Sequence, residues 1–226
     1  MQNLGSGQPF GSVNVGDEVV EGVEEFLYLG NKQTSDGSCW PDITRRIGLA
    51  SAVMSSLRRV WNNGQLSTDT KIHVYRALVL SVLLYGSETW TLLADDARKL
   101  EAFHMRCQRQ LLRVSWRDHI TNAEITDRTR LTSLKEQLSS RRASLFGHIA
   151  RLDTTVPAHL ALWLQTDITI GRKPDASWRR TPGRPRKTWI SQIQEDVHMS
   201  ARSYWDASTR RGHGRMTQRS FMTTRS

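Results

Sequence analysis

The run from Ala77 to Tyr85 constrains the fold of this chain most, because it is almost entirely apolar and ends at Gly86. A helix that is apolar all round has to be buried among other elements. A glycine directly after the last apolar residue is typical of a left-handed C-cap. The run is far shorter than the ~20 residues that span a bilayer. It therefore predicts the central helix of a soluble or peripheral protein, with no membrane among its partners.

Apolar residues at spacings of three and four predict further helices around this central one. Pro41 suits a first helical position, and Asn62-Asn63-Gly64 ends that helix. Ser67 is a predicted N-cap, and Thr121 with Glu124 has the spacing of a capping box, as has Ser133 with Glu136. The predicted helices cover residues 41–61, 68–85, 96–113, 122–128, 134–151, 157–164 and 189–197.

The first forty residues predict a small antiparallel β unit. Val13–Val15 and Val19–Val23 flank Gly16-Asp17, which is a hairpin pattern. Glu25–Leu29 is a further predicted strand that Gly30 stops, and residues 31–39 are predicted to be a polar loop.

The C-terminal part predicts little regular structure. Residues 171–187 carry three prolines and two glycines and are predicted to be a linker, and residues 202–226 are expected to be irregular. The predicted fold class is mainly α: a helical bundle with a small N-terminal β hairpin and an irregular basic C-terminal tail. The predicted domains are a β unit (1–40), a helical domain (41–165) and a basic linker with a short helix and tail (166–226).

The charge is unevenly distributed and predicts a polyanionic partner. The net charge of +10 is the sum of −5 over residues 1–40, +6 over 41–170 and +9 over 171–226. Nucleic acid is the first candidate and a membrane surface the second, while a solvated basic tail is the alternative. Two cysteines, Cys39 and Cys107, make no disulfide framework, which favours a reducing compartment inside the cell, the nucleus or the cytoplasm.

Three basic sets are candidates for nucleic-acid contact. Arg106, Arg109 and Arg113 recur on one face of the third predicted helix, and a second set lies on the first predicted helix. Such faces can follow phosphates, although a solvated helix face is the alternative. The members of the second set are Arg45, Arg46, Arg58 and Arg59.

The third basic set lies in the linker and resembles an AT-hook around Gly183-Arg184-Pro185. An extended Arg-Pro segment can enter a narrow minor groove. Pro182 stands where the hook has an arginine, which favours non-specific contact over A·T preference, and a plain basic linker is the alternative. The flanking cations are Arg179, Arg180, Arg186 and Lys187.

The residues that could carry chemistry do not form a catalytic or metal-binding pattern. Asp95 and Asp96 open a predicted helix, where carboxylates satisfy free N–H groups. His104 and Cys107 have metal-ligand spacing, but a zinc site needs four ligands, so no metal or cofactor is predicted. Most tryptophans are expected to anchor the core, namely Trp40, Trp61, Trp90, Trp116 and Trp163, whereas Trp178 and Trp189 flank the linker and could stack on bases.

Five strings occur in one order along the chain. They are Phe26-Leu27-Tyr28-Leu29-Gly30, Arg45-Arg46-Ile47-Gly48-Leu49-Ala50, Leu83-Leu84-Tyr85-Gly86-Ser87-Glu88-Thr89-Trp90, Gly147-His148-Ile149-Ala150-Arg151 and Pro182-Gly183-Arg184-Pro185-Arg186-Lys187-Thr188-Trp189. In this order they resemble the C-terminal part of the reverse transcriptase of non-LTR (LINE-type) retrotransposons. The resemblance covers nearly the whole chain.

The resemblance implies an RNA-directed DNA polymerase fragment that binds nucleic acid without its own catalytic centre. Residues 26–30 resemble the primer grip, which contacts the sugar-phosphate backbone, and the helices that follow resemble a thumb. The family's catalytic aspartates precede the primer grip. Ala94-Asp95-Asp96 departs from that signature, because Leu93 replaces an aromatic residue and residues 97–103 have helical period.

On this resemblance, Met1 is expected to mark a truncation, and the missing palm of the parent would use Mg²⁺. The fragment itself would be no enzyme and would hold an RNA–DNA hybrid or duplex DNA. Two alternatives stay open. One is a domesticated remnant that acts as a DNA-binding or chromatin module through residues 171–187. The other is an inert helical interaction protein.

Overall fold

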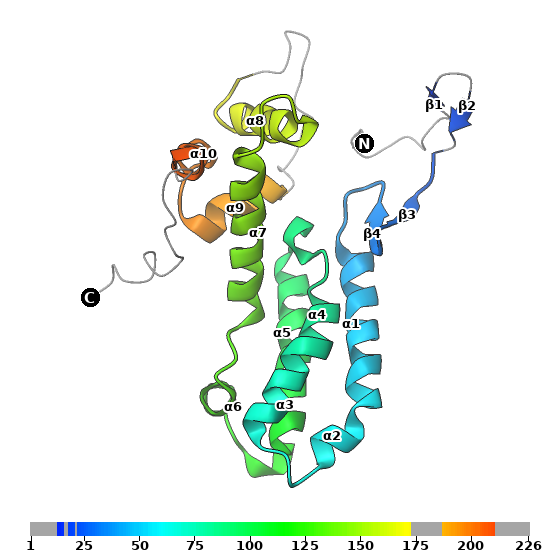
Figure 1. The fold of residues 1–226 in the computed structure, drawn as a ribbon, viewed down its shortest axis with the longest axis vertical. Coiled ribbons are helices and arrows are strands. Elements are labelled where there is room, and N and C mark those ends of the chain that lie inside the picture. Colours follow the sequence, from blue (N-terminus) through cyan, green and yellow to red (C-terminus); the bar gives the residue numbers. More distant parts are fainter. Residues whose placement is uncertain (1–12, 16–17, 21, 173–186, 211–226) are drawn as a thin grey trace. The chain divides into compact units, whose positions relative to one another are not determined.

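The computed structural model describes residues 13–15, 18–20, 22–172 and 187–210. It is mainly helical, with short antiparallel hairpins before the first helix, which confirms the predicted fold class (Figure 1). The chain groups into two compact units, unit 1 (residues 1–138) and unit 2 (139–226), with the boundary inside α7 (Leu134–Ala150). This division differs from the predicted boundaries after residues 40 and 165. Most of the predicted linker and the end of the tail lie outside the described residues.

Two separate hairpins precede the helices. β1 (Val13–Val15) pairs with β2 (Glu18–Val20), as predicted, and β3 (Glu25–Tyr28) pairs with β4 (Asn31–Thr34) in antiparallel register. β4 corrects the prediction of a polar loop. Leu29 and Gly30 both have positive φ, +47° and +79°, so the chain reverses in two residues and the polar segment pairs directly with β3.

The first predicted helix is divided in two. α1 (Trp40–Ser56) ends at Leu57, and α2 (Arg58–Asn62) is a single further turn. The indole Nε1 of Trp61 donates a hydrogen bond of 2.8 Å to the carbonyl of Met54, so the buried tryptophan folds back onto the end of α1. Residues 41–61 therefore form two helices where their apolar spacing predicted one.

The central helical stretch contains a feature that periodicity does not reveal. Ser67 caps α3 (Thr68–Val74), as predicted, and α3 leads into a π-helix, η1 (Tyr75–Leu80), and then α4 (Ser81–Leu83). Gly86 follows with φ of +72°, which confirms the left-handed end. Val79, Leu80, Leu83 and Leu84 are buried, whereas Leu78 and Tyr85 are about half exposed, so the stretch is not buried on every side.

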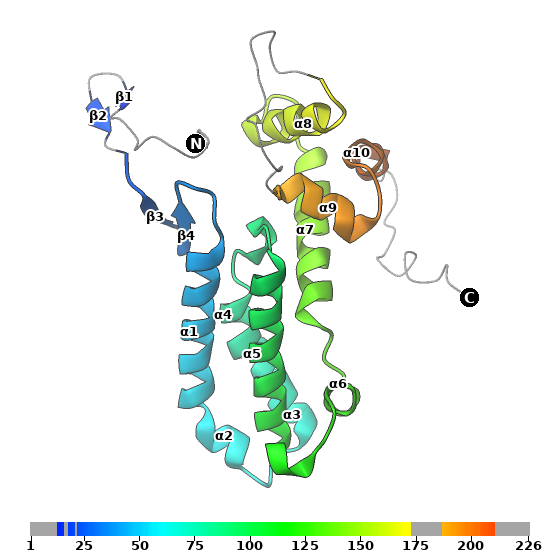
Figure 2. The ribbon, with the colours of Figure 1, turned by 180° about the vertical axis from the view of Figure 1, so that it is seen from behind.

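Unit 1 is completed by α5 (Ala94–Leu112) and α6 (Asn122–Thr129), with short 3₁₀ turns η2 (Ser87–Thr89) and η3 (Trp116–Asp118). Figures 1 and 2 show α1, α4 and α5 side by side. With side chains from α2 and η1 they form one apolar core, whose fully buried members include Ile43, Trp61, Tyr75, Leu83, Leu100 and Leu111.

Unit 2 has its own core. It contains most of α7, α8 (Pro157–Thr169), α9 (Trp189–Val197) and α10 (Ala201–Arg210). α10 corrects the expectation that the chain is irregular from residue 202. Tyr204 and Trp205 form ring contacts with the fully buried Phe146, and this aromatic cluster stabilises the helix. In the part of the chain that the structure describes, no helix has both the length and the apolar character to cross a membrane.

Candidate nucleic-acid interface

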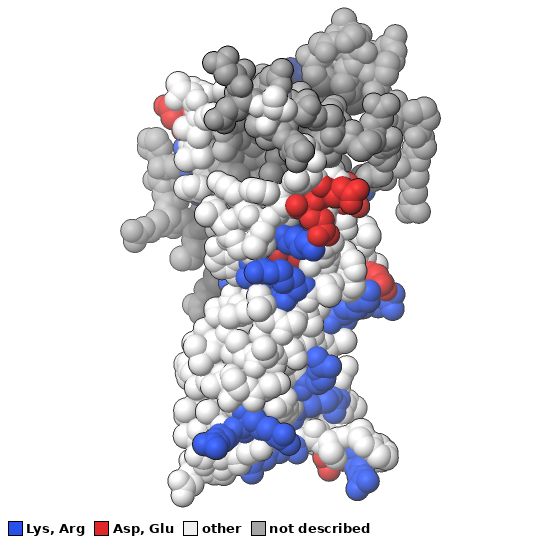
Figure 3. Space-filling model, turned by 90° about the vertical axis from the view of Figure 1, so that its right-hand side faces the viewer, with Lys and Arg blue, Asp and Glu red and all other residues white. Residues whose placement is uncertain are grey.

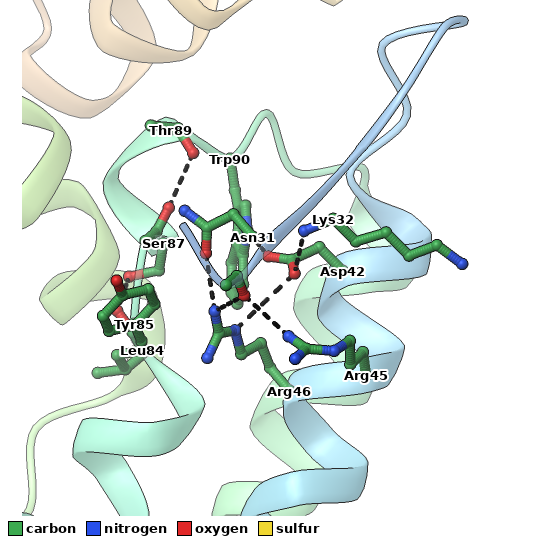
Figure 4. Close-up of polar contacts among 12 residues, drawn as sticks. Asn31, Lys32, Asp42, Arg45, Arg46, Leu84, Tyr85, Ser87, Thr89 and Trp90 are labelled. Carbon is green, nitrogen blue, oxygen red and sulfur yellow. Dashed lines mark hydrogen bonds and ion pairs between the residues drawn. The ribbon is translucent and has the colours of Figure 1, made fainter. Parts of the chain in front are cut away.

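The primer-grip-like segment forms β3 and the turn that follows it, and the carbonyls of this turn are bound within the protein (Figure 4). Arg45 Nη1 donates to the carbonyl of Gly30 at 2.8 Å, and Arg46 donates to the same oxygen. The Tyr85 hydroxyl donates to the carbonyl of Leu29 at 2.9 Å. The turn is therefore attached both to α1 and to the end of the central helical stretch. The side chains of residues 26–29 remain more than half exposed.

A buried carboxylate supports this turn from α1. Asp42 accepts a hydrogen bond from the backbone N–H of Lys32 and another from Trp90 Nε1, each at 2.9 Å. It also forms an ion pair of 3.8 Å with Nε of Arg46, which is only 6% exposed. Burial lowers the pKa of Arg46, and the neighbouring Asp42 opposes that change. Asp42 thus compensates the buried guanidinium and ties β4 to α1.

Gly86 allows the close approach between this network and the central stretch. The Nη2 of Arg46 donates to the side-chain oxygen of Asn31 at 2.8 Å, and its guanidinium lies 4.5 Å from the centre of the Tyr85 ring. A Cβ at position 86 would lie 2.1 Å from the Asn31 amide nitrogen. The turn, the arginine pair and the Tyr85-Gly86 pair come from three of the five family-like strings. These strings are distant in sequence, yet they meet in one hydrogen-bonded cluster.

The three arginines predicted to share a helix face have different surroundings, and Arg113 follows α5 as its left-handed C-cap, with a φ of +56°. Arg109 donates to the carbonyl of Ile120 and to the side-chain oxygen of Asn122, each at 2.8 Å. Arg113 Nε donates to the carbonyl of Trp61 at 3.3 Å. Arg106 is exposed, with its guanidinium 5.4 Å from the ring of Phe103. Two of the three predicted phosphate contacts therefore have structural bonds of their own.

A surface pocket next to α2 gathers cations without a carboxylate in its lining. Its volume is about 640 Å³, and its lining residues are Ser55, Ser56, Arg58, Arg59, Asn62 and Asn63. Figure 3 shows Lys and Arg side chains gathered over the lower part of the face that carries α1, the part toward α2, with few acidic side chains among them.

Two more cations meet the last turn of α2. Lys71 is buried, and its Nζ donates to the carbonyl of Trp61 at 2.9 Å, the same oxygen that Arg113 contacts. Desolvation is the main cause that lowers the pKa of Lys71, and the nearby Arg113 adds to it. We call the group formed by Arg58, Arg59, Lys71 and Arg113 the α2 basic cluster.

Trp116 differs from the expectation that it anchors the core. Its side chain is 78% exposed, and the guanidinium of Arg117 lies 5.5 Å from its ring centre. Trp61 and Trp90 are buried as predicted, whereas Trp40 and Trp163 are each 37% exposed. The residues beside it in the turn, Ser115, Arg117 and Asp118, are exposed as well, so the whole turn lies at the surface.

The linker arginines Arg179, Arg180, Arg184 and Arg186, with the AT-hook-like core, lie outside the described residues. Lys187 lies just after them and forms an ion pair of 2.7 Å with Glu195. In the string at 147–151, Arg151 approaches the carbonyl of Ser208 at 3.5 Å. In the last string, Trp189 lies against the ring of Phe146.

Of the aspartate pair, Asp96 has the predicted capping role. Asp96 accepts a hydrogen bond of 3.2 Å from the backbone N–H of Leu93 at the start of α5. Asp95 is exposed and forms ion pairs with Arg98 and Lys99, which lower the pKa of its carboxyl. Both carboxylates are thus engaged at a helix N-terminus, as their position in the sequence predicts.

His104 and Cys107, the pair with metal-ligand spacing, lie in the core. The Tyr75 hydroxyl and His104 Nδ1 are hydrogen-bonded at 2.8 Å. Burial lowers the pKa of His104 to about 4 and raises the pKa of Cys107 to about 12, so both side chains are neutral near pH 7. Across the described residues, no three His, Cys, Asp or Glu side chains are grouped closely enough to hold a metal ion.

Comparison with known proteins gives two matches. The profile of a family described as a domain of unknown function (DUF6451) matches residues 54–85, which run from the end of α1 to Tyr85. An uncharacterised transposon-derived protein of Caenorhabditis elegans is 24% identical over 192 residues, which cover 79% of this chain and 62% of the relative. The chain thus spans less than two thirds of that relative's length. No solved structure matches the chain significantly. The chain is therefore similar to a protein of transposon origin.

Proposed function

We propose that this chain is the region that follows the catalytic palm of a non-LTR retrotransposon reverse transcriptase, and that it binds nucleic acid through Arg58 and Arg59 of the α2 basic cluster. The observation that supports the binding role is that the side chains of Arg58 and Arg59 are exposed and unpaired within the described residues. Both are exposed and line a pocket without carboxylates, and within the described residues neither has a hydrogen bond or an ion pair. Guanidinium groups that are free of carboxylates can neutralise phosphates.

The proposed origin is supported by two independent findings. The relative from Caenorhabditis elegans is described as transposon-derived. In addition, three of the strings that resemble the retrotransposon family meet at the turn of Leu29 and Gly30, where Arg46 donates to the carbonyl of Gly30 and Tyr85 to the carbonyl of Leu29. Each of these strings supplies a contact that the others need, so a folded protein is expected to keep them together. Common descent from a folded unit therefore explains the resemblance better than chance similarity of short strings.

No polymerisation step is assigned to this chain. A two-metal polymerase centre needs carboxylates that are free to bind Mg²⁺. Asp96 is hydrogen-bonded at the start of α5 and Asp95 is ion-paired on its first turn, so the pair does not fit that task. The proposed role is to hold an RNA–DNA hybrid or duplex DNA, in the nucleus or the cytoplasm, where the parent polymerase would act.

Binding can be tested with fluorescently labelled RNA–DNA hybrid and duplex DNA, titrated with the full chain at several salt concentrations. Each phosphate contact contributes about 0.9 to the slope of log affinity against log salt on duplex DNA. Arg58→Gln with Arg59→Gln is expected to reduce that slope by about 2 if each guanidinium meets one phosphate. These side chains have no partner in the described part of unit 1, so the free energy of unfolding is expected to stay unchanged.

The matched control is Arg98→Gln with Arg128→Gln. Both arginines are exposed but paired with carboxylates, Asp95 and Glu124. These changes are expected to leave the slope as it is. No binding to either nucleic acid at low salt would refute the proposed function. If deletion of residues 171–226 lowers the affinity for nucleic acid more than substitution of Arg58 and Arg59 does, the result would favour the chromatin-module alternative.

A further inference from the structure

Trp116 is the most exposed tryptophan for which the structure gives a side-chain environment, and it lies within a basic stretch of unit 1. We propose that Trp116 and the α2 basic cluster form a site for single-stranded nucleic acid, in which the indole stacks on an unpaired base and the arginines bind adjacent phosphates. This inference rests on the proposed function, because it assigns a strand type and a stacking residue to the same surface.

The turn that carries Trp116 is held rigidly. Asp118 accepts hydrogen bonds from the backbone N–H and the hydroxyl of Ser115, at 2.6 and 2.9 Å, and these bonds lower the pKa of its carboxyl. His119 then ends the turn with a φ of +50°. The only carboxylate of the turn is thus engaged as a cap. A ring on a preorganised turn loses little conformational freedom when it stacks, which favours binding.

The ring and the cluster are connected through the short segment that follows α5. Arg113 lies three residues before Trp116 and donates to the carbonyl of Trp61 in the last turn of α2. Arg117, next to Trp116, is exposed, and its guanidinium lies 5.5 Å from the indole ring. The segment that presents the indole therefore begins at the α2 basic cluster. Cations beside an exposed aromatic ring are the combination with which proteins bind single strands.

A single strand fits this surface better than a duplex. The face of a base is available for stacking only when the base is unpaired or terminal, whereas a closed duplex presents phosphates and groove edges. Arg58 and Arg59 alone would bind both kinds of nucleic acid. The exposed indole gives an additional contact that only an unpaired base can make. This contact is what would make the affinity for a single strand higher than that for a closed duplex.

The test compares labelled single-stranded RNA and DNA of about 12 nucleotides with a duplex whose ends are closed by loops, using the full chain. Loss of one stacked base costs about 1–3 kcal/mol, so Trp116→Ala is expected to weaken single-strand affinity roughly 5- to 150-fold. The duplex affinity, and the salt dependence of affinity for all three ligands, are expected to stay within error. Trp116→Phe, which keeps an aromatic ring, is expected to restore most of the affinity.

The control is Trp163→Phe in unit 2, a tryptophan that is 37% exposed; it is expected to leave both affinities unchanged. The outcomes separate this inference from the proposed function. If the wild type binds the closed duplex but Trp116→Ala has no effect on single strands, the inference is wrong and the proposed function stands. If Trp116→Ala weakens both ligands equally, stacking on an unpaired base is refuted. If the wild type binds none of the ligands, the proposed function itself fails.

Discussion

Gly86→Ala is the substitution that most directly tests how the family-like strings are joined. Gly86 has a φ of +72°, which an alanine adopts only at a cost. The added Cβ would lie 2.1 Å from the amide nitrogen of Asn31 and 2.3 Å from its side-chain oxygen. Because an amide group is mobile, Asn31 can move away, but it then loses its 2.8 Å bond from Arg46.

The expected cost follows from these two parts. The left-handed conformation costs an alanine about 1–2 kcal/mol. A hydrogen bond to a charged group contributes about 1.5–3 kcal/mol, of which Arg46 retains part through Gly30 and Asp42. Gly86→Ala should therefore lower the free energy of unfolding of unit 1 by about 2–4 kcal/mol. In an Asn31→Ala background only the backbone part remains, about 1–2 kcal/mol.

The assay is a double-mutant cycle on Gly86 and Asn31. Urea unfolding is followed by hydrogen exchange of amides in α1 and α5, which reports unit 1 alone. The two substitutions are expected to be non-additive by about 1–2 kcal/mol, since the double variant loses the Arg46–Asn31 bond only once. Gly48→Ala is the control: nothing lies within 4 Å of its added Cβ in α1, so it should stabilise the helix by up to about 1 kcal/mol.

Two results would refute this reasoning. If Gly86→Ala lowers the free energy of unfolding by the same amount with and without the Asn31 side chain, the close contact with Asn31 is not what disfavours a side chain at position 86. If Gly86→Ala is as favourable as Gly48→Ala, the left-handed end of the central stretch is wrong. In that case the three strings would have to be joined in another way.

Two further predictions concern buried ionisable side chains. Arg142 and Asp196 form an ion pair of 2.6 Å inside unit 2, so Arg142→Met should lower its stability by about 3–5 kcal/mol in thermal unfolding, with partial recovery on adding Asp196→Leu. His104 has a pKa of about 4 in the folded state against an ordinary 6.5, so the unfolded chain binds more protons between these values and stability falls as the pH drops through that window. Between pH 7 and pH 5 the loss should be about 2 kcal/mol, and His104→Gln should remove it, as measured by urea unfolding at the two pH values.

The parts of the fold that depend on local patterns could be predicted from the sequence. Ser67, Thr121 and Ser133 cap their helices through side-chain oxygens, and Gly86 ends the central stretch. The remaining parts depend on contacts between distant segments. β4 pairs because its turn is bound to α1 and Tyr85, and α10 forms because its rings meet Phe146. The π-helical turn η1 keeps an apolar pattern that fits an α-helix equally well.

In the candidate site, too, the features that depend on contacts between distant segments could not be predicted from the sequence. Residue type and spacing identified Arg46 and Arg58 as one basic set on the first predicted helix. The structure separates them: Arg46 is buried against Asp42, whereas Arg58 lines an open pocket. Trp116 was assigned to the core on residue type alone. The Ser115–Asp118 spacing is the capping signal in the sequence that could have indicated a short exposed turn.

The difference between arginines bonded within the protein and arginines without a partner in the described part of the chain decides how mutagenesis of the basic residues should be designed. Arg109 and Arg113 hold backbone carbonyls of unit 1, so their replacement lowers stability and, through it, binding. Arg58 and Arg59 have no such bonds within the described residues, so their replacement can change only what the surface binds. A scan that records affinity alone would rank both kinds together. Affinity measured against salt, with the free energy of unfolding determined for each variant, distinguishes them, because only a direct phosphate contact changes the salt slope while the stability stays constant.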